Sequence, residues 1–318
     1  MIEYKSVKKE IGDKCIIRDL SMTIHDGEFI VMIGPSGCGK TTTVKMINRL
    51  LEPTEGEILI DGVNTRDMDL VKLRTSIGYV IQQIGLFPNM TVEENIAVVP
   101  NIMKWDKEAI HQRVQELMEM VDMPYEQFGK KYPRQLSGGQ QQRIGVLRAL
   151  AARPPILLMD EPFGALDPIT RETLQREIKK IQQKLHITVL FITHDMHEAV
   201  KLADRIVFMD QGQILQMGTP KELICHPANE KVAQFISLQN VGLDEQQLTA
   251  EDIMTPSERV QVPQEDLVVS ADCLLSQLAD TVDLSDNRRI YVRNEQGRIV
   301  GELTAASILR RLVKKAPL

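Results

Sequence analysis

The sequence predicts an α/β fold, with strands and helices alternating along its 318 residues. Short apolar runs recur along the chain, and apolar residues at helical spacing fill the stretches between them. A glycine-rich loop directly follows one apolar run and precedes a helical stretch. Such alternation is typical of a sheet with helices packed on its faces, and a smaller α+β domain is expected to follow it.

The predicted strands are nearly continuous apolar runs, as expected for strands buried on both faces of a sheet. Helical spacing of apolar residues appears at residues 110–121 and again at residues 174–185. A turn at residues 210–213 is expected to join two short strands as a hairpin. The strands are predicted at residues 29–33, 58–60, 77–81, 156–159, 188–192 and 206–209.

A change of composition near residue 238 sets the expected domain boundaries. Residues 1–238 form the large domain, residues 239–249 a linker, and residues 250–318 a small domain. Acidic residues dominate the tail up to Asp286, and basic residues dominate from Arg288 onward. Within the small domain we expect a strand at 290–292, a turn at 294–297, an amphipathic segment at 274–282 and a final helix around residues 308–312.

Composition and charge exclude several classes of protein. A net charge of −6 and an aromatic content of 4% argue against a nucleic-acid-binding surface. The four cysteines lack the spacing of metal ligands, so reduced cytosolic thiols are expected. The N-terminus shows no apolar signal segment, and no apolar run approaches the roughly 18 residues of a membrane helix. If the protein serves a membrane process, another chain is expected to span the membrane.

The loop at residues 34–41 has the pattern of a phosphate site, because Gly34 and Gly39 frame four residues and Lys40 and Thr41 follow. Glycines let backbone N–H groups converge on phosphate oxygens, and a helix N-terminus adds partial positive charge. Lys40 is expected to reach the β- and γ-phosphates of a nucleotide, and the Thr41 hydroxyl to ligate Mg²⁺. The predicted nucleotide contacts are Gly34, Pro35, Ser36, Gly37, Cys38, Gly39, Lys40, Thr41 and Thr42.

Plainer interpretations of this loop exist. A glycine turn before a helix is one, but the strand that precedes the loop disfavours it. Cys38 suggests a redox switch, although a small residue that fills the loop is the favoured interpretation.

Two carboxylates end the apolar run at residues 156–159. Because alternate side chains of a strand point to opposite faces, Asp160 and Glu161 need not share a role. Asp160 fits a Mg²⁺ ligand, usually through water, and Glu161 fits the residue that orients and polarises an attacking water. An apolar strand ending in two acids is commonplace, so this interpretation depends on the phosphate loop.

A second glycine pair, in Leu136-Ser-Gly-Gly-Gln140, precedes another helical stretch. Ser137, Gly138, Gly139 and Gln140 combine a hydroxyl, two glycines and a helix N-terminus, which together favour an anion. A flexible glycine linker is the less favoured alternative. The run resembles the signature motif of ABC ATPases.

This resemblance implies a P-loop NTPase domain of the ABC type, with a RecA-like core, an antiparallel β subdomain and a helical subdomain. In that family the signature motif faces the γ-phosphate held by the other subunit. The resemblance therefore implies a head-to-tail dimer with two composite ATP sites, in which residues 137–140 contact the partner's nucleotide.

Three further residues match motifs of the same family. Gln82 resembles the Q-loop glutamine, which senses Mg²⁺ and water and couples to the membrane subunit. Asp167, in Ala165-Leu-Asp167, resembles the D-loop aspartate at the dimer interface, and His194 resembles the switch histidine that contacts the γ-phosphate. A lone histidine at a strand end is usually structural, so the catalytic interpretation of His194 rests on its place in this series of motifs. The implied catalytic residues are Glu161, His194 and Gln82, and the implied metal ligands are Thr41, Gln82 and Asp160.

Residues 1 to about 238 are similar throughout to ATPases of bacterial importers, and segments 45–50, 82–88 and 159–168 are most similar to the glycine betaine/carnitine/choline subfamily. This implies an ATP-hydrolysing subunit, using ATP and Mg²⁺, that powers import of a small quaternary-amine osmoprotectant. The implied partners are a second copy of the chain, integral-membrane permease subunits and, indirectly, an extracytoplasmic substrate-binding protein, with no nucleic acid. The implied location is the cytoplasmic face of a bacterial cell membrane.

Ile11 departs from the family pattern, because it stands where an aromatic residue normally stacks on adenine. Isoleucine offers apolar contact without a π-face, so weaker base recognition is expected. Tyr4 is a nearby substitute, although its place in the first strand does not favour that role.

The tail resembles a single CBS domain, a regulatory module. Residues 251–255 resemble its entry and residues 301–308 its closing strand and helix. Ser307 stands where an acid usually binds the ribose of an adenine nucleotide, which disfavours nucleotide binding. A pairing with the copy on a second subunit and a purely structural dimerisation segment remain equal alternatives.

Three other interpretations of the function stay open from the sequence. One is a soluble ABC ATPase acting on DNA repair or ribosomes, although the usual coiled-coil insertion or second cassette is missing from these residues. Another is an importer ATPase for a different small solute. A tail whose ligand sensing dominates the function is a third interpretation.

Overall fold

The computed structural model describes residues 1–82, 85–164, 166–239, 249–257, 267–274, 278, 289–294, 296–305 and 307–308. The chain divides into two compact units, which are described separately. The first unit comprises residues 1–223 and 228–239, and the second comprises residues 224–227 and 240–318.

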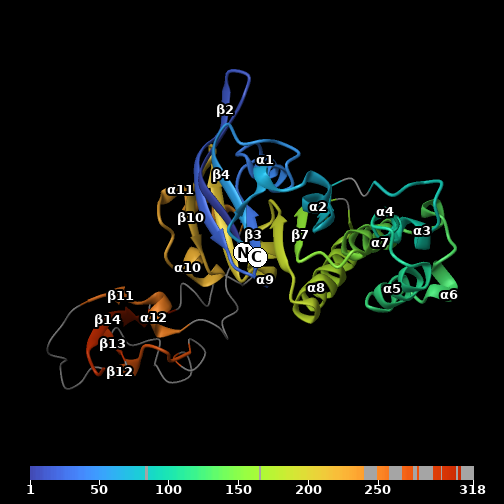
Figure 1. Cartoon of the computed structure of the whole chain (residues 1–318). Coiled ribbons are helices and arrows are strands. Elements are labelled where there is room, and N and C mark those ends of the chain that lie inside the picture. Colours follow the sequence, from blue (N-terminus) through green and yellow to red (C-terminus); the bar gives the residue numbers. More distant parts are fainter. Residues whose placement is uncertain are drawn as a thin grey trace. The chain divides into compact units, whose positions relative to one another are not determined.

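The first unit is built on a sheet with the strand order β5-β4-β1-β2-β10-β9-β3-β8-β7-β6 (Figure 1). Strands β9, β3, β8, β7 and β6 pair in parallel, and β1, β2, β4 and β5 pair antiparallel. A parallel pairing of β2 with β10 joins the two halves. The strands are β1 (Ile2–Ile11), β2 (Lys14–Ile24), β3 (Phe29–Ile33), β4 (Glu55–Ile60), β5 (Val63–Asn64), β6 (Ile77–Val80), β7 (Ile156–Asp160), β8 (Thr188–Ile192), β9 (Arg205–Asp210) and β10 (Gln213–Gly218).

The parallel half confirms the predicted α/β sheet. Every residue of β3, β7 and β8 is buried, which is the reason these strands are continuous apolar runs in the sequence. The boundaries differ by a few residues: β6 ends at Val80 rather than at Ile81, and β4 begins at Glu55. The predicted hairpin turn is also confirmed, with β9 and β10 antiparallel and Gln211 and Gly212 at positive φ.

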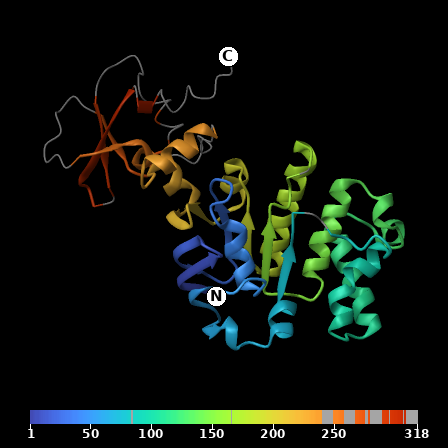
Figure 2. The same cartoon turned by 90° about the horizontal axis from the view of Figure 1, so that it is seen from above.

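Helices cover the sheet and form a separate group beside it. The group from α3 to α7 lies to one side of the strands in both views (Figures 1 and 2). Predicted helical spacing is confirmed in α8, whose Leu174, Ile178 and Ile181 are buried, and in α5, although Val121 lies beyond its end. The helices are α1 (Lys40–Ile47), α2 (Leu70–Thr75), α3 (Val92–Ile96), α4 (Val98–Ile102), α5 (Lys107–Glu119), α6 (Tyr125–Phe128), α7 (Gly138–Leu150), α8 (Pro168–Leu185), α9 (Met196–Leu202), α10 (Pro220–Cys225) and α11 (Glu230–Leu238), with short 3₁₀ turns at Thr65–Asp67 and Pro133–Gln135.

Asn95 fixes the segment that leads from the region of Gln82 into the helix group. Its buried amide accepts from the Phe87 N–H at 2.8 Å and donates to the carbonyls of Phe87, Met90 and Thr91 at 3.0–3.1 Å. Asn95→Ala is expected to lower the free energy of unfolding by about 2 kcal/mol, because it leaves several backbone groups without their partner. Urea denaturation measures this change. The exposed Asn101→Ala is the matched control and is expected to stay within about 0.5 kcal/mol, so equal losses would contradict the role of Asn95.

The second unit contains a sheet with the order β11-β14-β13-β12, formed by β11 (Thr255–Pro256), β12 (Leu267–Ser270), β13 (Arg289–Arg293) and β14 (Ile299–Thr304), together with α12 (Ala250–Ile253). The predicted strand at 290–292 is β13, and its three apolar residues are buried. The predicted turn joins β13 to β14, where the Asn294 N–H donates to the Arg298 carbonyl at 2.9 Å. Leu275 and Val282 of the predicted amphipathic segment, and Leu309 and Leu312 of the predicted final helix, lie outside the described residues.

Across the part of the chain that the structure describes, no helix is both long enough and apolar enough to span a bilayer.

Candidate functional site

The loop between β3 and α1 has a backbone that only glycine adopts easily. Gly34, Gly37 and Gly39 have φ values of 145°, 78° and 112°. A Cβ atom on Gly34 would lie 2.0 Å from the Met209 carbonyl oxygen on β9. Helix α1 begins at Lys40 without a side-chain cap, so its first N–H groups are open to an anionic ligand.

Lys40 places its ammonium group inside this loop. The side chain is buried and donates to the carbonyls of Gly34 at 2.8 Å and Pro35 at 3.0 Å. These carbonyls hold the charge at the position where the loop's N–H groups and the α1 N-terminus also concentrate positive potential. The arrangement is suited to a polyphosphate.

A hard-oxygen pair lies next to the loop. The Thr41 hydroxyl donates at 3.0 Å to Oδ1 of Asp160, which is the last residue of β7. Burial raises the pKa of the Asp160 carboxyl, and the hydrogen bond from Thr41 opposes that rise. A nearby cation would favour the ionised form, and hydroxyl and carboxylate oxygens are ligands that suit Mg²⁺. The donor set therefore fits the predicted metal.

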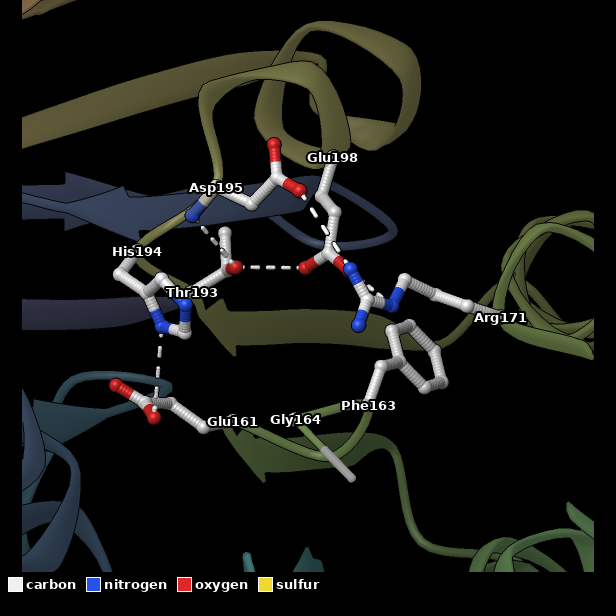
Figure 3. A pocket seen from close by; sticks show the side chains of 8 residues that line it. All are labelled: Glu161, Phe163, Gly164, Arg171, Thr193, His194, Asp195 and Glu198. Atoms are coloured by element: carbon white, nitrogen blue, oxygen red, sulfur yellow. Dashed lines mark hydrogen bonds and ion pairs between the residues drawn. The ribbon is translucent and has the colours of Figure 1, made fainter. Parts of the chain in front are cut away.

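Glu161, Gln82 and His194 meet at the ends of three neighbouring strands. The Glu161 Oε2 atom lies 3.4 Å from Gln82 Nε2. The same oxygen lies 3.6 Å from His194 Nδ1 (Figure 3). Glu161 also has a positive φ of 44°, an uncommon conformation for a residue with a side chain, and its N–H donates to the Ile192 carbonyl. This turn carries Glu161 away from the buried side chains of β7, so that its carboxylate meets Gln82 and His194 at the edge of the sheet.

The second glycine motif stands apart from this cluster. Ser137 caps α7 by accepting from the Gln140 N–H at 3.3 Å, and the Gln140 side chain accepts from the Ser137 N–H at 3.0 Å. A Cβ atom on Gly139 would lie 2.4 Å from Thr170 Cγ2 of α8, whereas Gly138 has open space around it. Among the described residues, no hydrogen bond or ion pair joins residues 137–140 to the phosphate loop.

Asp167 and Ile11, two further predicted contacts, lie at the start of a helix and at the end of a strand. Asp167 caps α8 by accepting from the Thr170 N–H at 3.0 Å, while the preceding Ala165 lies outside the described residues. Ile11 ends β1 and is 50% exposed, so its side chain is free to contact a ligand. Tyr4 is not available as a substitute, because it is buried and its hydroxyl donates to the Thr43 carbonyl.

Cys38 is shielded within the phosphate loop. It is buried, and burial raises the pKa of its thiol, opposed by the nearby charge of Lys40. We expect iodoacetamide to alkylate Cys38 at least about 10-fold more slowly than the exposed Cys15, because a thiolate is the reacting form. Peptide mass spectrometry over time measures both rates, and the protein unfolded in urea is the control in which the two should converge. Equal rates in the folded protein would favour the redox interpretation.

Sequence reasoning missed a polar group behind His194. Glu198 is buried on α9 among the apolar residues Met196, Ala199 and Leu202. Arg171 of α8 forms an ion pair with Glu198, with Nε 3.8 Å from Oε1. A carboxylate on the apolar face of a helix was the signal that the sequence offered, since buried acids are rarely left without partners.

The comparisons with known proteins agree with this geometry. Residues 17–164 match the family model described as ABC transporter. The chain is 57% identical over 242 residues to the glycine betaine/carnitine/choline transport ATP-binding protein OpuCA of Bacillus subtilis (strain 168), covering 76% of this chain and 63% of that protein. It is 47% identical over 243 residues to the glycine betaine uptake system ATP-binding protein YehX of Escherichia coli (strain K12), covering 76% of this chain and 79% of that protein.

The match to OpuCA thus spans less than two thirds of that relative's length. Among solved structures, the dimeric post-hydrolysis structure of the ATP-binding cassette MJ0796 with ADP and Pi is similar, with a TM-score of 0.61 and 36% identity over 69% of this chain and 99% of that chain. Strand order, phosphate loop and relatives together lead to one conclusion: the chain belongs to the ABC transporter family and has the P-loop fold of its ATP-binding cassettes.

Proposed function

We propose that this chain is the ATP-hydrolysing subunit of an importer for a small quaternary-amine osmoprotectant. The observation that carries the proposal is the meeting of Glu161 with Gln82 and His194 beside the Thr41–Asp160 pair. Lys40 and the loop N–H groups would hold the β- and γ-phosphates of ATP, and Thr41, Asp160 and Gln82 would hold Mg²⁺. Glu161 would accept a proton from the attacking water.

A second copy of the chain would complete each nucleotide site. Within the described residues, the motif at 137–140 makes no hydrogen bond or ion pair to its own phosphate loop, and its glycine pair and helix N-terminus suit an anion. The similar MJ0796 cassette forms a dimer with ADP and Pi, which supports the same arrangement here. Asp167 would lie at that interface, and Ile11 would make an apolar contact with adenine.

The substrate class follows from similarity, since this subunit would not touch the substrate. OpuCA and YehX are named for glycine betaine, carnitine or choline transport and for glycine betaine uptake. We propose that this chain works with integral-membrane permease subunits at the cytoplasmic face of a bacterial membrane, and indirectly with an extracytoplasmic substrate-binding protein.

Reconstitution tests this proposal. The chain, its permease and its binding protein are assembled in proteoliposomes, and uptake of labelled glycine betaine, carnitine and choline is followed with and without ATP. ATP-dependent uptake of at least one quaternary amine is the expected result. Uptake of only a different class of solute would contradict the substrate class, and hydrolysis without any permease association would favour a soluble ATPase.

For residues 250–318 we propose a single CBS-like domain that regulates the transporter or pairs two subunits. Its described sheet and the Asn294 turn are compatible with that module. Deletion of residues 240–318 separates the alternatives. Unchanged response of uptake to ionic strength and to adenine nucleotides, with weaker self-association, would leave only the pairing role.

A further inference from the structure

A small polar pocket lies behind His194, between α8, α9 and the segment after β8 (Figure 3). Its volume is about 30 Å³, which is enough for a water molecule. It is lined by Glu161, Phe163, Arg171, Thr193, His194, Asp195 and Glu198, together with Gly164. Of these, Arg171, Thr193, Asp195 and Glu198 contact one another behind His194.

Glu198 fixes the backbone segment that carries His194. Its carboxylate accepts from the Thr193 hydroxyl at 2.6 Å and from Gln175 Nε2 at 3.1 Å. The Thr193 hydroxyl in turn accepts from the Asp195 N–H at 3.0 Å. The segment on both sides of His194 is thus held from behind, whereas the His194 side chain itself is 66% exposed.

Arg171 connects that segment to the loop before α8. One guanidinium nitrogen donates to the Leu166 carbonyl at 3.1 Å, next to Asp167. The other two nitrogens lie 3.8 Å from Asp195 and 3.8 Å from Glu198. The rigid, planar guanidinium thus faces three partners, of which only the Leu166 carbonyl is within hydrogen-bond distance, and the buried Nε atom has no hydrogen-bond partner among the described residues.

Helix α8 is itself anchored to the helix of the signature-like motif. Arg143 of α7 and Glu177 of α8 form a bidentate pair at 2.9 and 2.7 Å. Thr170 of α8 packs against Gly139. A shift of residues 137–140 or of Asp167 on dimer contact would therefore move Arg171 as part of one rigid helix.

We propose that Arg171 is a positioning residue that sets the place of His194 relative to Asp167, through Asp195 and Glu198. The inference rests on the proposed ATPase function. Arg171 contacts both the loop next to Asp167 and the acid next to His194. When a second copy binds at Asp167 and displaces that loop, the Arg171 guanidinium therefore transmits the displacement to the segment that carries His194. Arg171 acts on catalysis only by way of His194.

Arg171→Gln in the full-length protein tests this role, with Arg176→Gln as the control, since Arg176 is an exposed arginine of the same helix. Steady-state hydrolysis of Mg-ATP gives kcat and KM, in the wild-type background and in His194→Ala. We expect kcat to fall roughly 10- to 100-fold in Arg171→Gln, as for other misplaced catalytic groups. The KM is expected to stay within about 3-fold, and Arg176→Gln to stay near wild type.

The second background decides between positioning and general structural damage. In His194→Ala, measured by single turnover, Arg171→Gln is expected to cause no further fall, because its effect passes through His194. An equal fall in both backgrounds, or a wild-type rate in Arg171→Gln, would overturn the inference while the proposed function stands. If Arg171→Gln unfolds, Glu198→Gln is compared in the same two backgrounds with the same criterion. If the wild-type protein does not hydrolyse ATP, the proposed function is overturned, and this inference with it.

Discussion

Glu161→Gln is expected to bind ATP and form a dimer with it, yet to hydrolyse ATP roughly 10²- to 10⁴-fold more slowly than the wild type. Glutamine keeps the size of the side chain and its contacts with Gln82 and His194, but it cannot accept a proton from water. The phosphate loop and the Thr41–Asp160 pair are left intact, so affinity for the nucleotide should persist. Because unhydrolysed ATP would stay bound between the two copies, the variant should accumulate as the dimer.

Two measurements check this result: the rate of phosphate release and size-exclusion chromatography with Mg-ATP. Glu126→Gln is the matched control, since Glu126 is exposed on α6 within the helix group. Hydrolysis at the wild-type rate in Glu161→Gln would remove Glu161 from its catalytic role. Loss of ATP binding would instead show that the carboxylate is needed to shape the site.

The parallel half of the sheet could be predicted from the sequence because burial on both faces leaves a simple pattern. Phe29–Ile33 and Thr188–Ile192 are found within the bounds that their apolar runs gave. The antiparallel half gives a weaker pattern. The pairing of β1 with β2 contains register shifts, and Ser6 in β1 has a positive φ of 44°, so the alternation of apolar and polar residues is broken.

The candidate site was accessible to sequence reasoning because its residues follow buried strands. Asp160, Glu161 and His194 come directly at or after strand ends, where parallel strands bring them to one edge. The contacts of Arg171 could not be predicted from the sequence, because they depend on how α8 packs against α9 and on the loop at Leu166. No short motif encodes that packing, and only the buried carboxylate of Glu198 signalled it.

Gly34→Ala is expected to destabilise the protein by about 3 kcal/mol or more and to remove ATP binding. The backbone at Gly34 has a φ of 145°, and an added Cβ would lie 2.0 Å from the Met209 carbonyl oxygen. That oxygen cannot easily move away, because it belongs to β9, which pairs with β3 directly before the loop. The loop itself must therefore shift, and its N–H groups would no longer converge on phosphate.

Gly37→Ala separates this steric effect from backbone strain. Gly37 also has a positive φ, of 78°, but nothing lies within 4 Å of the position that an added Cβ would take. Only the left-handed conformation opposes alanine there, so a loss of about 1 kcal/mol is expected, with ATP binding retained. Thermal unfolding and equilibrium binding of ATP measure both variants. Equal losses in the two would mean that strain alone, rather than contact with β9, makes glycine necessary at position 34, and the sheet would then have no part in shaping the phosphate loop.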